Sequence, residues 1–446
     1  MRRFAALICG MLTLSAAAWA QDDSERLALY QQFRAEFDAR RFEDALARAN
    51  ELVSATESTF GNDALELAIP LTNVGTTALR LGNLGLAETS YLRSVTVLDA
   101  NTRGANADLI PPLHGLGLTY LAKNDPTSAA IALRRAVDLS RNLNGLYNIG
   151  QLPIVESLIS AEVALNQLAD AEKEHQYAYR IAETNYGATD PRMLPAMANY
   201  AAWFESMGRF STARRMYAQA LGVAENSLGK AALESVPPLR GIARTYMLEF
   251  LLGYEDPEAS AAAQDPFASQ NQTGAQLQRV NTDGEKALLI ALDRINKATP
   301  PDLGLRGQTL LDLGDWYLVG ANSAKALGVY QQAWPDLVAS NQLDLVAKPR
   351  QLAYKAPSSS ITRSSYDPDK EDLRVVEVKC SVSETGKIGD CESMRSEASD
   401  AQERSVIFAA KKSRYAPRME NGVTVPTEGI IVRDSLVVAK PAPPKS

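Results

Sequence analysis

The chain has 446 residues and a formal net charge of −7, a length typical of roughly two to four domains or of one long repeat array. An acidic chain lacks the basic surface that phosphate binding requires, which excludes non-specific nucleic-acid binding as its main role. Three cysteines and two histidines are too few for a zinc cluster.

The first twenty residues have the pattern of a secretory signal. Arg2 and Arg3 precede the uncharged, 17-residue run FAALICGMLTLSAAAWA (4–20), which ends in small residues. This order predicts a cleaved signal peptide over 1–20, with cutting after Ala20. A membrane anchor is the alternative, but the run is shorter than the roughly 20 residues that a spanning helix needs. We therefore expect a periplasmic or otherwise exported protein with no integral membrane span after cleavage.

A repeat of 42 residues follows the signal. Small residues recur at fixed positions after short polar turns, and such residues let two helix backbones approach closely. One helical hairpin cannot bury its apolar face alone, so repeated hairpins stack. The repeat therefore predicts at least ten helices over 26–230. The alignment rests on the column Ala45, Ala87, Ala129, Ala171 and Ala213.

This pattern resembles the tetratricopeptide repeat in its longer, 42-residue form, like that of kinesin light chains, over about 26–343. The third repeat matches the family's positions best, with Leu116, Gly117, Tyr120 and Ala136 among them. The resemblance implies an α-solenoid over 21–343 whose first helices line a concave, partner-binding face.

The repeat register breaks after the sixth unit begins. An Ala-, Ser- and Gln-rich segment over 254–274 has no sustained periodicity and predicts a loop or a flexible insertion. A helix over 284–298 follows, and a seventh unit over 310–334 returns to the repeat pattern.

The C-terminal part of the chain changes from helical to alternating periodicity. Proline, serine and mixed charges predict a linker over 344–371, before a domain over 372–438 and a tail over 439–446. The expected elements are a strand over 373–382, a second strand in KIGDCESM (387–394), a helix over 399–413 capped by Ser399 or Asp400, and a last strand within 425–438.

This β-β-α-β segment, over about 370–438, resembles the C-terminal domain of TonB-like proteins. The match rests on the turn glycine Gly386, on the basic-aromatic-proline signature RYAP (414–417) and on Gly422 before the last strand. The resemblance implies a sheet edge to which a partner's strand can be added. The expected fold class is therefore mostly α, a tetratricopeptide α-solenoid followed by a small α+β, TonB-like domain.

Two cysteines remain after the expected signal cleavage. A two-residue turn at Thr385-Gly386 would place Cys380 directly opposite Cys391 on adjacent strands. In an oxidising compartment this arrangement predicts a disulfide. A longer turn would leave the two residues diagonal to each other, and two buried free thiols are the alternative.

The sequence contains no recognisable catalytic or metal-binding motif. His114 and His175 lie in predicted helices, far in sequence from both cysteines of the C-terminal domain. The motifs HExxH and GxSxG and the phosphate loop are absent. We therefore expect no enzymatic activity, no metal and no cofactor.

Four residues are candidates for binding a peptide. Asn73 and Asn199 lie in one repeat column, in which the resembling family often uses Asn to hold a bound peptide's backbone; an amide can both donate to and accept from a peptide group. Arg240 and Arg244 lie one helical turn apart and could meet an acidic tail. The alternative for all four is an ordinary solvated surface.

These observations together predict a non-catalytic scaffold that binds protein or peptide partners of the cell envelope through a repeat groove and a TonB-like module. The alternative is an accessory component of TonB-type energy transduction to outer-membrane transporters. A true TonB protein keeps an uncleaved anchor, so an uncleaved N-terminus would favour the alternative and a mature N-terminus at Gln21 would favour the scaffold. The sequence leaves the partner and the oligomeric state open.

Overall fold

The computed structural model describes most of the chain. The predicted signal peptide (1–20), nearly all of the predicted insertion (254–274) and most of the predicted tail (439–446) lie outside the described residues. None of the described helices is both long and apolar enough to cross a membrane. The chain divides into two compact units, Met1–Ala188 and Thr189–Ser446. The described residues are 24–103, 106–252, 272–361, 366–367 and 369–440.

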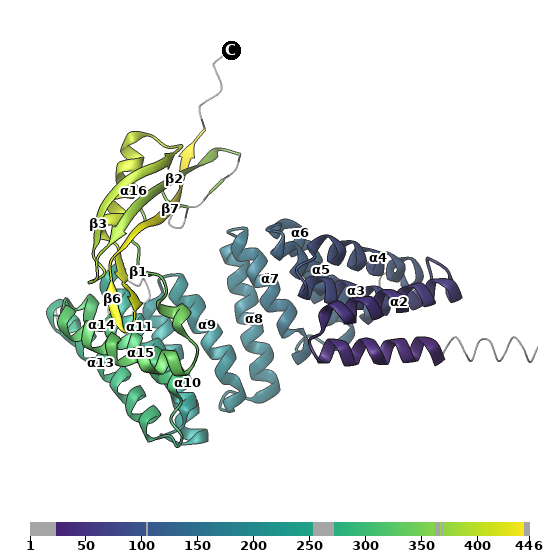
Figure 1. Ribbon diagram of the computed structural model, residues 1–446, viewed down its shortest axis with the longest axis horizontal. Coiled ribbons are helices and arrows are strands. Elements are labelled where there is room, and N and C mark those ends of the chain that lie inside the picture. Colours follow the sequence, from purple (N-terminus) through teal and green to yellow (C-terminus); the bar gives the residue numbers. More distant parts are fainter. Residues whose placement is uncertain (1–23, 104–105, 253–271, 362–365, 368, 441–446) are drawn as a thin grey trace, which may run out of the picture. The chain divides into compact units, whose positions relative to one another are not determined.

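The described part of the first unit consists of helical hairpins (Figure 1). From α3 onward, a helix of 13 residues alternates with a helix of 19 residues. After a helix over residues 24–38, the bounds are α2 Phe42–Phe60, α3 Ala68–Arg80, α4 Leu84–Thr102, α5 Ile110–Ala122, α6 Pro126–Asn144, α7 Leu152–Ala164 and α8 Leu168–Tyr186.

The second unit begins with the same alternation of helix lengths. The predicted helix over 284–298 corresponds to the C-terminal part of a longer helix, α13. The helices α3, α5, α7, α9 and α11 start 42 residues apart, which confirms the repeat period. The bounds are α9 Leu194–Ser206, α10 Phe210–Leu228, α11 Val236–Leu252, α13 Gln272–Lys297, α14 Leu303–Val319 and α15 Ser323–Ala339.

Close helix packing accounts for the columns of small residues. All five members of the alanine column that defines the repeat are fully buried. The ring of Tyr91, on α4, lies directly on the backbones of α3 and α5. A Cβ atom added to Gly75 or to Gly115 would lie 2.8 Å or 2.2 Å from that ring. An aromatic side chain can therefore fill the space between consecutive hairpins only where the neighbouring helices carry glycine.

Each of the first hairpins turns through one left-handed residue. These residues lie 42 positions apart, and their φ angles are between 58° and 74°. Glycine and asparagine tolerate this conformation better than other residues. The residues are Arg40, Gly82, Asn124, Asn166 and Gly208.

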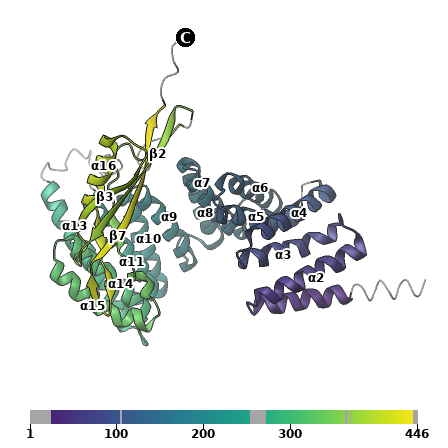
Figure 2. The ribbon, with the colours of Figure 1, turned by 45° about the horizontal axis from the view of Figure 1, so that its top comes forward.

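The end of the second unit is a three-stranded antiparallel sheet with the strand order β3-β2-β7. Figures 1 and 2 both show α16 lying on one face of this sheet. Val376 and Val378 of β2 pack there against Val406 of α16. The order β-β-α-β of the main elements is therefore as predicted. The bounds are β2 Glu371–Val382, β3 Ile388–Ser396, α16 Asp400–Lys412 and β7 Thr427–Ala439.

Four short strands were not predicted from the sequence. Strand β1 (Arg350–Ala353) pairs with β4 (Arg414–Ala416), while β5 (Arg418–Glu420) and β6 (Val423–Val425) form a hairpin. Strand β1 belongs to the segment that the sequence predicts to be a linker. Ser360 of the same segment forms a β-bridge with Leu436. The predicted linker 344–371 is therefore part of the folded unit at these positions and is not a free spacer there.

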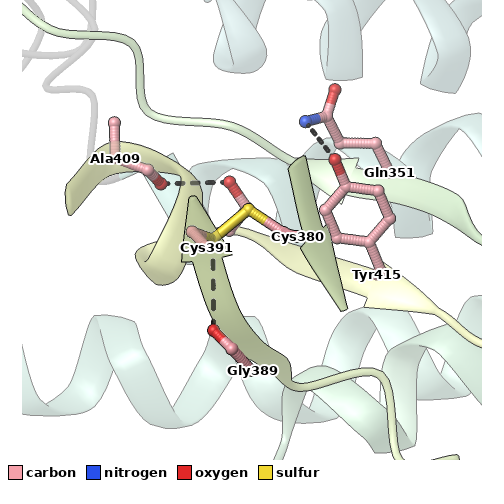
Figure 3. Close-up of a disulfide and its surroundings, with 7 residues drawn as sticks. Gln351, Cys380, Gly389, Cys391, Ala409 and Tyr415 are labelled. Atoms are coloured by element: carbon pink, nitrogen blue, oxygen red, sulfur yellow. Dashed lines mark hydrogen bonds between the residues drawn. A yellow bond between two sulfur atoms is a disulfide. The ribbon is translucent and has the colours of Figure 1, made fainter. Parts of the chain in front are cut away.

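A disulfide joins Cys380 of β2 to Cys391 of β3, as Figure 3 shows. The turn between the strands is longer than the predicted two residues, because Val382 pairs with Ile388. Strand β3 then carries one extra residue opposite Ser381, and this bulge returns Cys380 to a position directly opposite Cys391. The predicted pairing is present, but the turn expected to produce it is not.

The contact between Tyr91 and Gly115 predicts a measurable difference between two Gly→Ala substitutions. Gly115→Ala should destabilise the chain by about 2 kcal/mol, because the new methyl group overlaps the ring. Gly85→Ala, on exposed helix α4 with nothing within 4 Å, should be neutral or stabilise by about 0.5 kcal/mol. Denaturant unfolding followed by circular dichroism would measure both changes, and equal effects would contradict the packing argument.

Candidate functional site

The second unit contains an apolar pocket of about 520 Å³ between α9, α10 and the start of α11. One stripe of α9 forms a wall, with Leu194, Ala198 and Ala202 among its residues. Tyr217 and Ala220 of α10 form another part of the lining. Few groups in this lining need hydrogen bonds, so the pocket suits an apolar ligand with a small number of polar contacts.

Prolines at the starts of two helices add rigid, apolar surface to the pocket. Pro195 lies in the first turn of α9, and Pro237 and Pro238 lie in the first turn of α11. Proline is favoured at such positions because the first N–H groups of a helix have no partner within the helix. The residues that start these helices therefore also shape the pocket.

Two of the four predicted site residues, Arg240 and Arg244, line this pocket but are already paired within the chain. Arg240 donates to the carboxylate of Asp312 and, over 2.8 Å, to Oε1 of Gln308, both on α14. Arg244 donates to the carboxylate of Glu205 and, over 3.0 Å, to the hydroxyl of Tyr217. The expectation that both arginines meet an acidic tail therefore needs correction, since such a tail would compete with two existing ion pairs.

The ion pair beside Tyr217 affects its ionisation and that of Arg244. Burial, reinforced by the charge of Glu205, raises the pKa of Tyr217 to about 12. Burial tends to lower the pKa of Arg244, but the hydrogen bond and charge of Glu205 outweigh it, so this pKa is raised. Near neutral pH the phenol is uncharged and the guanidinium is charged next to a carboxylate. This side of the pocket is thus electrostatically balanced.

The two predicted asparagines lie in different units. Asn199 is exposed and lines the pocket, together with Arg240 and Arg244. Asn73 lies on α3 of the first unit, half-buried, and its buried Nδ2 has no hydrogen-bond partner among the described residues. The structure therefore brings three of the four predicted residues together and leaves Asn73 in the other unit.

Packing gives the asparagine column a second meaning that the sequence reasoning missed. The same column, at intervals of 42 residues, holds Gly115 and Gly241. Each of these glycines lies against an aromatic ring, Tyr91 or Tyr217, with no room for a Cβ atom. The glycines in this column are therefore dictated by the neighbouring rings. The paired residues of α4 and α10 in the sequence were the available signal.

A second cavity of about 240 Å³ lies beneath β1, between α11, α14 and the strand. Asp315, almost fully buried, accepts from Nη2 of Arg350 at 3.0 Å to each carboxylate oxygen and from the Tyr330 hydroxyl at 2.6 Å. Burial raises the pKa of Asp315, while the charge of Arg350 opposes that rise. Gln351 also donates to the hydroxyl of Tyr415 (Figure 3). These contacts, here called the β1 clamp, attach the strand-rich module to the last repeat.

The two histidines occupy structural positions. His114 lies 3.0 Å, Nε2 to Oγ, from Ser157 of α7, and burial lowers its pKa. Burial also lowers the pKa of His175 to about 4. Both imidazoles are therefore neutral near pH 7. Among the described residues, no group of three or more His, Cys, Asp or Glu side chains is placed to hold a metal ion.

Comparison with known proteins places the chain near helical-repeat structures. No protein-family model matches it, and neither does any curated protein. Among solved structures, TPR-like repeats of a kinesin light chain from Podosopora anserina are 14% identical, with a TM-score of 0.42 over 46% of this chain and 97% of theirs. BtubC from P. vanneervenii is 17% identical, with a TM-score of 0.40 over 58% and 92% of the two chains.

A third similar structure is the C-terminal part of a TPR repeat-containing protein from Cytophaga hutchinsonii. It is 13% identical, with a TM-score of 0.42, and the match covers 70% of this chain and 94% of that chain. These similarities accompany the TPR-like hairpins described above, but their scores are too low to support a functional argument. The functional argument must come from the residues of this chain.

The β1 clamp predicts a pH-dependent effect of Arg350→Ala. The substitution leaves the buried Asp315 carboxylate without its cation and should destabilise the second unit by about 3 kcal/mol near pH 7. Without Arg350 the folded-state pKa of Asp315 rises further above its unfolded value, so the penalty should shrink as the pH falls towards about 4. Adding Asp315→Asn should remove the pH dependence. Denaturant titrations at both pH values would test this, and a loss independent of pH would contradict it.

Proposed function

We propose that this protein is an exported, non-catalytic scaffold of the cell envelope that binds protein or peptide partners through the pocket of its repeats and through a TonB-like C-terminal module. The pocket on α9, α10 and α11 is the observation that carries this proposal. It is concave and largely apolar, and it has the volume of a ligand site. It also contains three of the residues that the repeat pattern predicts to bind peptides.

The lining of the pocket favours an uncharged, extended segment with apolar side chains. The alanines of α9 and the prolines of α11 would contact those side chains. The amide of Asn199 would bond to a peptide group as both donor and acceptor. Arg240 and Arg244 keep their carboxylate partners, which disfavours an acidic segment because it would have to displace them.

The C-terminal module offers a second surface of different chemistry. Strand β3 lies at one edge of the sheet. At the other edge, the backbone of residues 359–361 already bonds to β7: N–H of Ile361 donates to Ser435 over 2.8 Å, and N–H of Val437 donates to Ser359 over 2.7 Å. Edge strands can receive a partner's strand. We propose the β3 edge as the place where a partner's strand would be added.

Blocking the pocket is the direct test of the proposal. Ala202 is exposed on the pocket wall, so Ala202→Trp should fill the pocket without disturbing the core. Peptides selected on the full chain from a random library should bind this variant at least about tenfold more weakly, as fluorescence anisotropy would show. The matched control is Ala218→Trp, exposed on α10 outside the pocket lining, which should bind as the wild type does.

The asparagines supply a finer version of this test. Asn199→Ala should weaken binding by about fivefold, which corresponds to the loss of about 1 kcal/mol for one hydrogen bond. Asn73→Ala should weaken binding by a similar factor only for a segment that also contacts the first unit. If selected peptides bound Ala202→Trp with unchanged affinity, the pocket would not be the site, and binding would have to lie elsewhere, for example on the module.

The second candidate function is that of an accessory of TonB-type energy transduction to outer-membrane transporters. The β-β-α-β order and the unpaired outer edge of β3, within the part of the chain that is described, favour it. The state of the N-terminus distinguishes the candidates. For the scaffold, N-terminal sequencing of protein from the native envelope should give Gln21 as the first residue. A chain that retains residues 1–20 would support the accessory function and contradict the exported, cleaved form.

A further inference from the structure

The outward side of α16 combines an exposed aromatic ring with several cations. Phe408 is 60% exposed, whereas Val406 and Ala410 on the same helix are fully buried. Figures 1 and 2 show α16 on the outside of the sheet. The exposed residues that surround Phe408 in sequence are Arg404, Lys411, Lys412 and Arg414, and together these five residues are here called the α16 patch.

The cations of the patch have no carboxylate partners among the described residues, although the whole chain carries a net charge of −7. The acidic residues of α16, Asp400 and Glu403, lie in its first turn. Positive and negative charges are thus segregated along the helix. The Nζ atom of Lys412 lies 4.2 Å from the centroid of the Phe408 ring, so even the aromatic surface is covered by a cation.

Helix stability alone does not account for this arrangement. Lys411 and Lys412 lie in the last turn, where cations interact favourably with the helix dipole. Arg404 lies in the N-terminal half of α16, and Arg414 lies beyond the end of the helix, so neither gains in this way. Phe408 gains nothing from pointing to water. A binding surface explains all five residues at once.

We propose that the α16 patch docks this protein on an anionic lipid surface. The complementary charge is negative, and basic side chains near such a surface are attracted to it. An aromatic ring in the middle of the cations could enter the interfacial region while the Lys and Arg side chains extend to the headgroups. This role is independent of the proposed peptide pocket, which lies on α9, α10 and α11.

The shape of the patch favours a lipid surface over an acidic peptide. The five residues lie on the outside of a single helix and at its end, which is a convex surface. A peptide gains affinity by filling grooves or by adding a strand to a sheet edge. A lipid interface can rearrange around a protruding ring and offer one headgroup to each cation, so it needs no groove.

Flotation of the full chain with vesicles would test the proposal. The chain should bind vesicles containing about 30% phosphatidylglycerol, and binding should fall steeply when NaCl is raised from about 0.1 M to about 0.5 M. Lys411→Gln combined with Lys412→Gln should lower the partition coefficient by about 30-fold, on an estimate of about fivefold for each cation. Phe408→Ala should lower it further. Vesicles of phosphatidylcholine alone reveal any apolar insertion by residues 1–20.

A matched control removes the same charge elsewhere. Lys230→Gln combined with Lys348→Gln changes two exposed lysines outside the patch and should leave vesicle binding unchanged. Circular dichroism would show that both double variants are folded. The proposal is overturned if neutral and anionic vesicles bind equally, if the two double variants behave alike, or if poly-glutamate binds at the patch while vesicles do not.

Discussion

The architecture depends on how closely the backbones of neighbouring helices can approach. The alanine column is fully buried at every repeat, and the ring of Tyr91 lies on Gly75 and Gly115 with no space for a methyl group. The same relation recurs in the second unit between Tyr217 and Gly241. A close-packed interior transmits such a constraint, because a larger side chain can be accepted on one helix only where its neighbour is small. The 42-residue period is the sequence record of this constraint.

The features that are local in sequence were the predictable ones. Alanine columns, helix starts with proline and the alternating pattern of β2 each state a physical requirement in a short window. The left-handed turn residues were not predictable as a column, because Arg40, Gly82 and Asn124 meet one backbone requirement with different side chains. Strand β1 escaped prediction because its pairing with β4 depends on residues about 64 positions away, and four residues carry little periodicity.

The candidate site was predictable in its location but not in its chemistry. The repeat columns place Asn199, Arg240 and Arg244 on helices that share one pocket. The partner of Arg240, Asp312, lies 72 residues away, beyond the break in the repeat register. No pattern in the sequence connects the two, so the arginines looked free when their charges are already matched. The structure thereby changes the expected ligand from an acidic segment to an uncharged one.

Arg240 and Arg244 line both the peptide pocket and the cavity beneath β1, so the same side chains separate the two. The β1 clamp closes the second cavity and ties the strand-rich module to the last repeat through Asp315 and Arg350. The pocket and the α16 patch therefore belong to one folded unit and are not joined by a free linker. A rigid connection limits the distances at which both can be occupied, and where partner and lipid surface match that spacing, the second contact forms at high effective concentration. Two weak surfaces on this unit can thus produce one selective attachment, which is a physical reason for the chain to spend a buried ion pair on holding its two parts together.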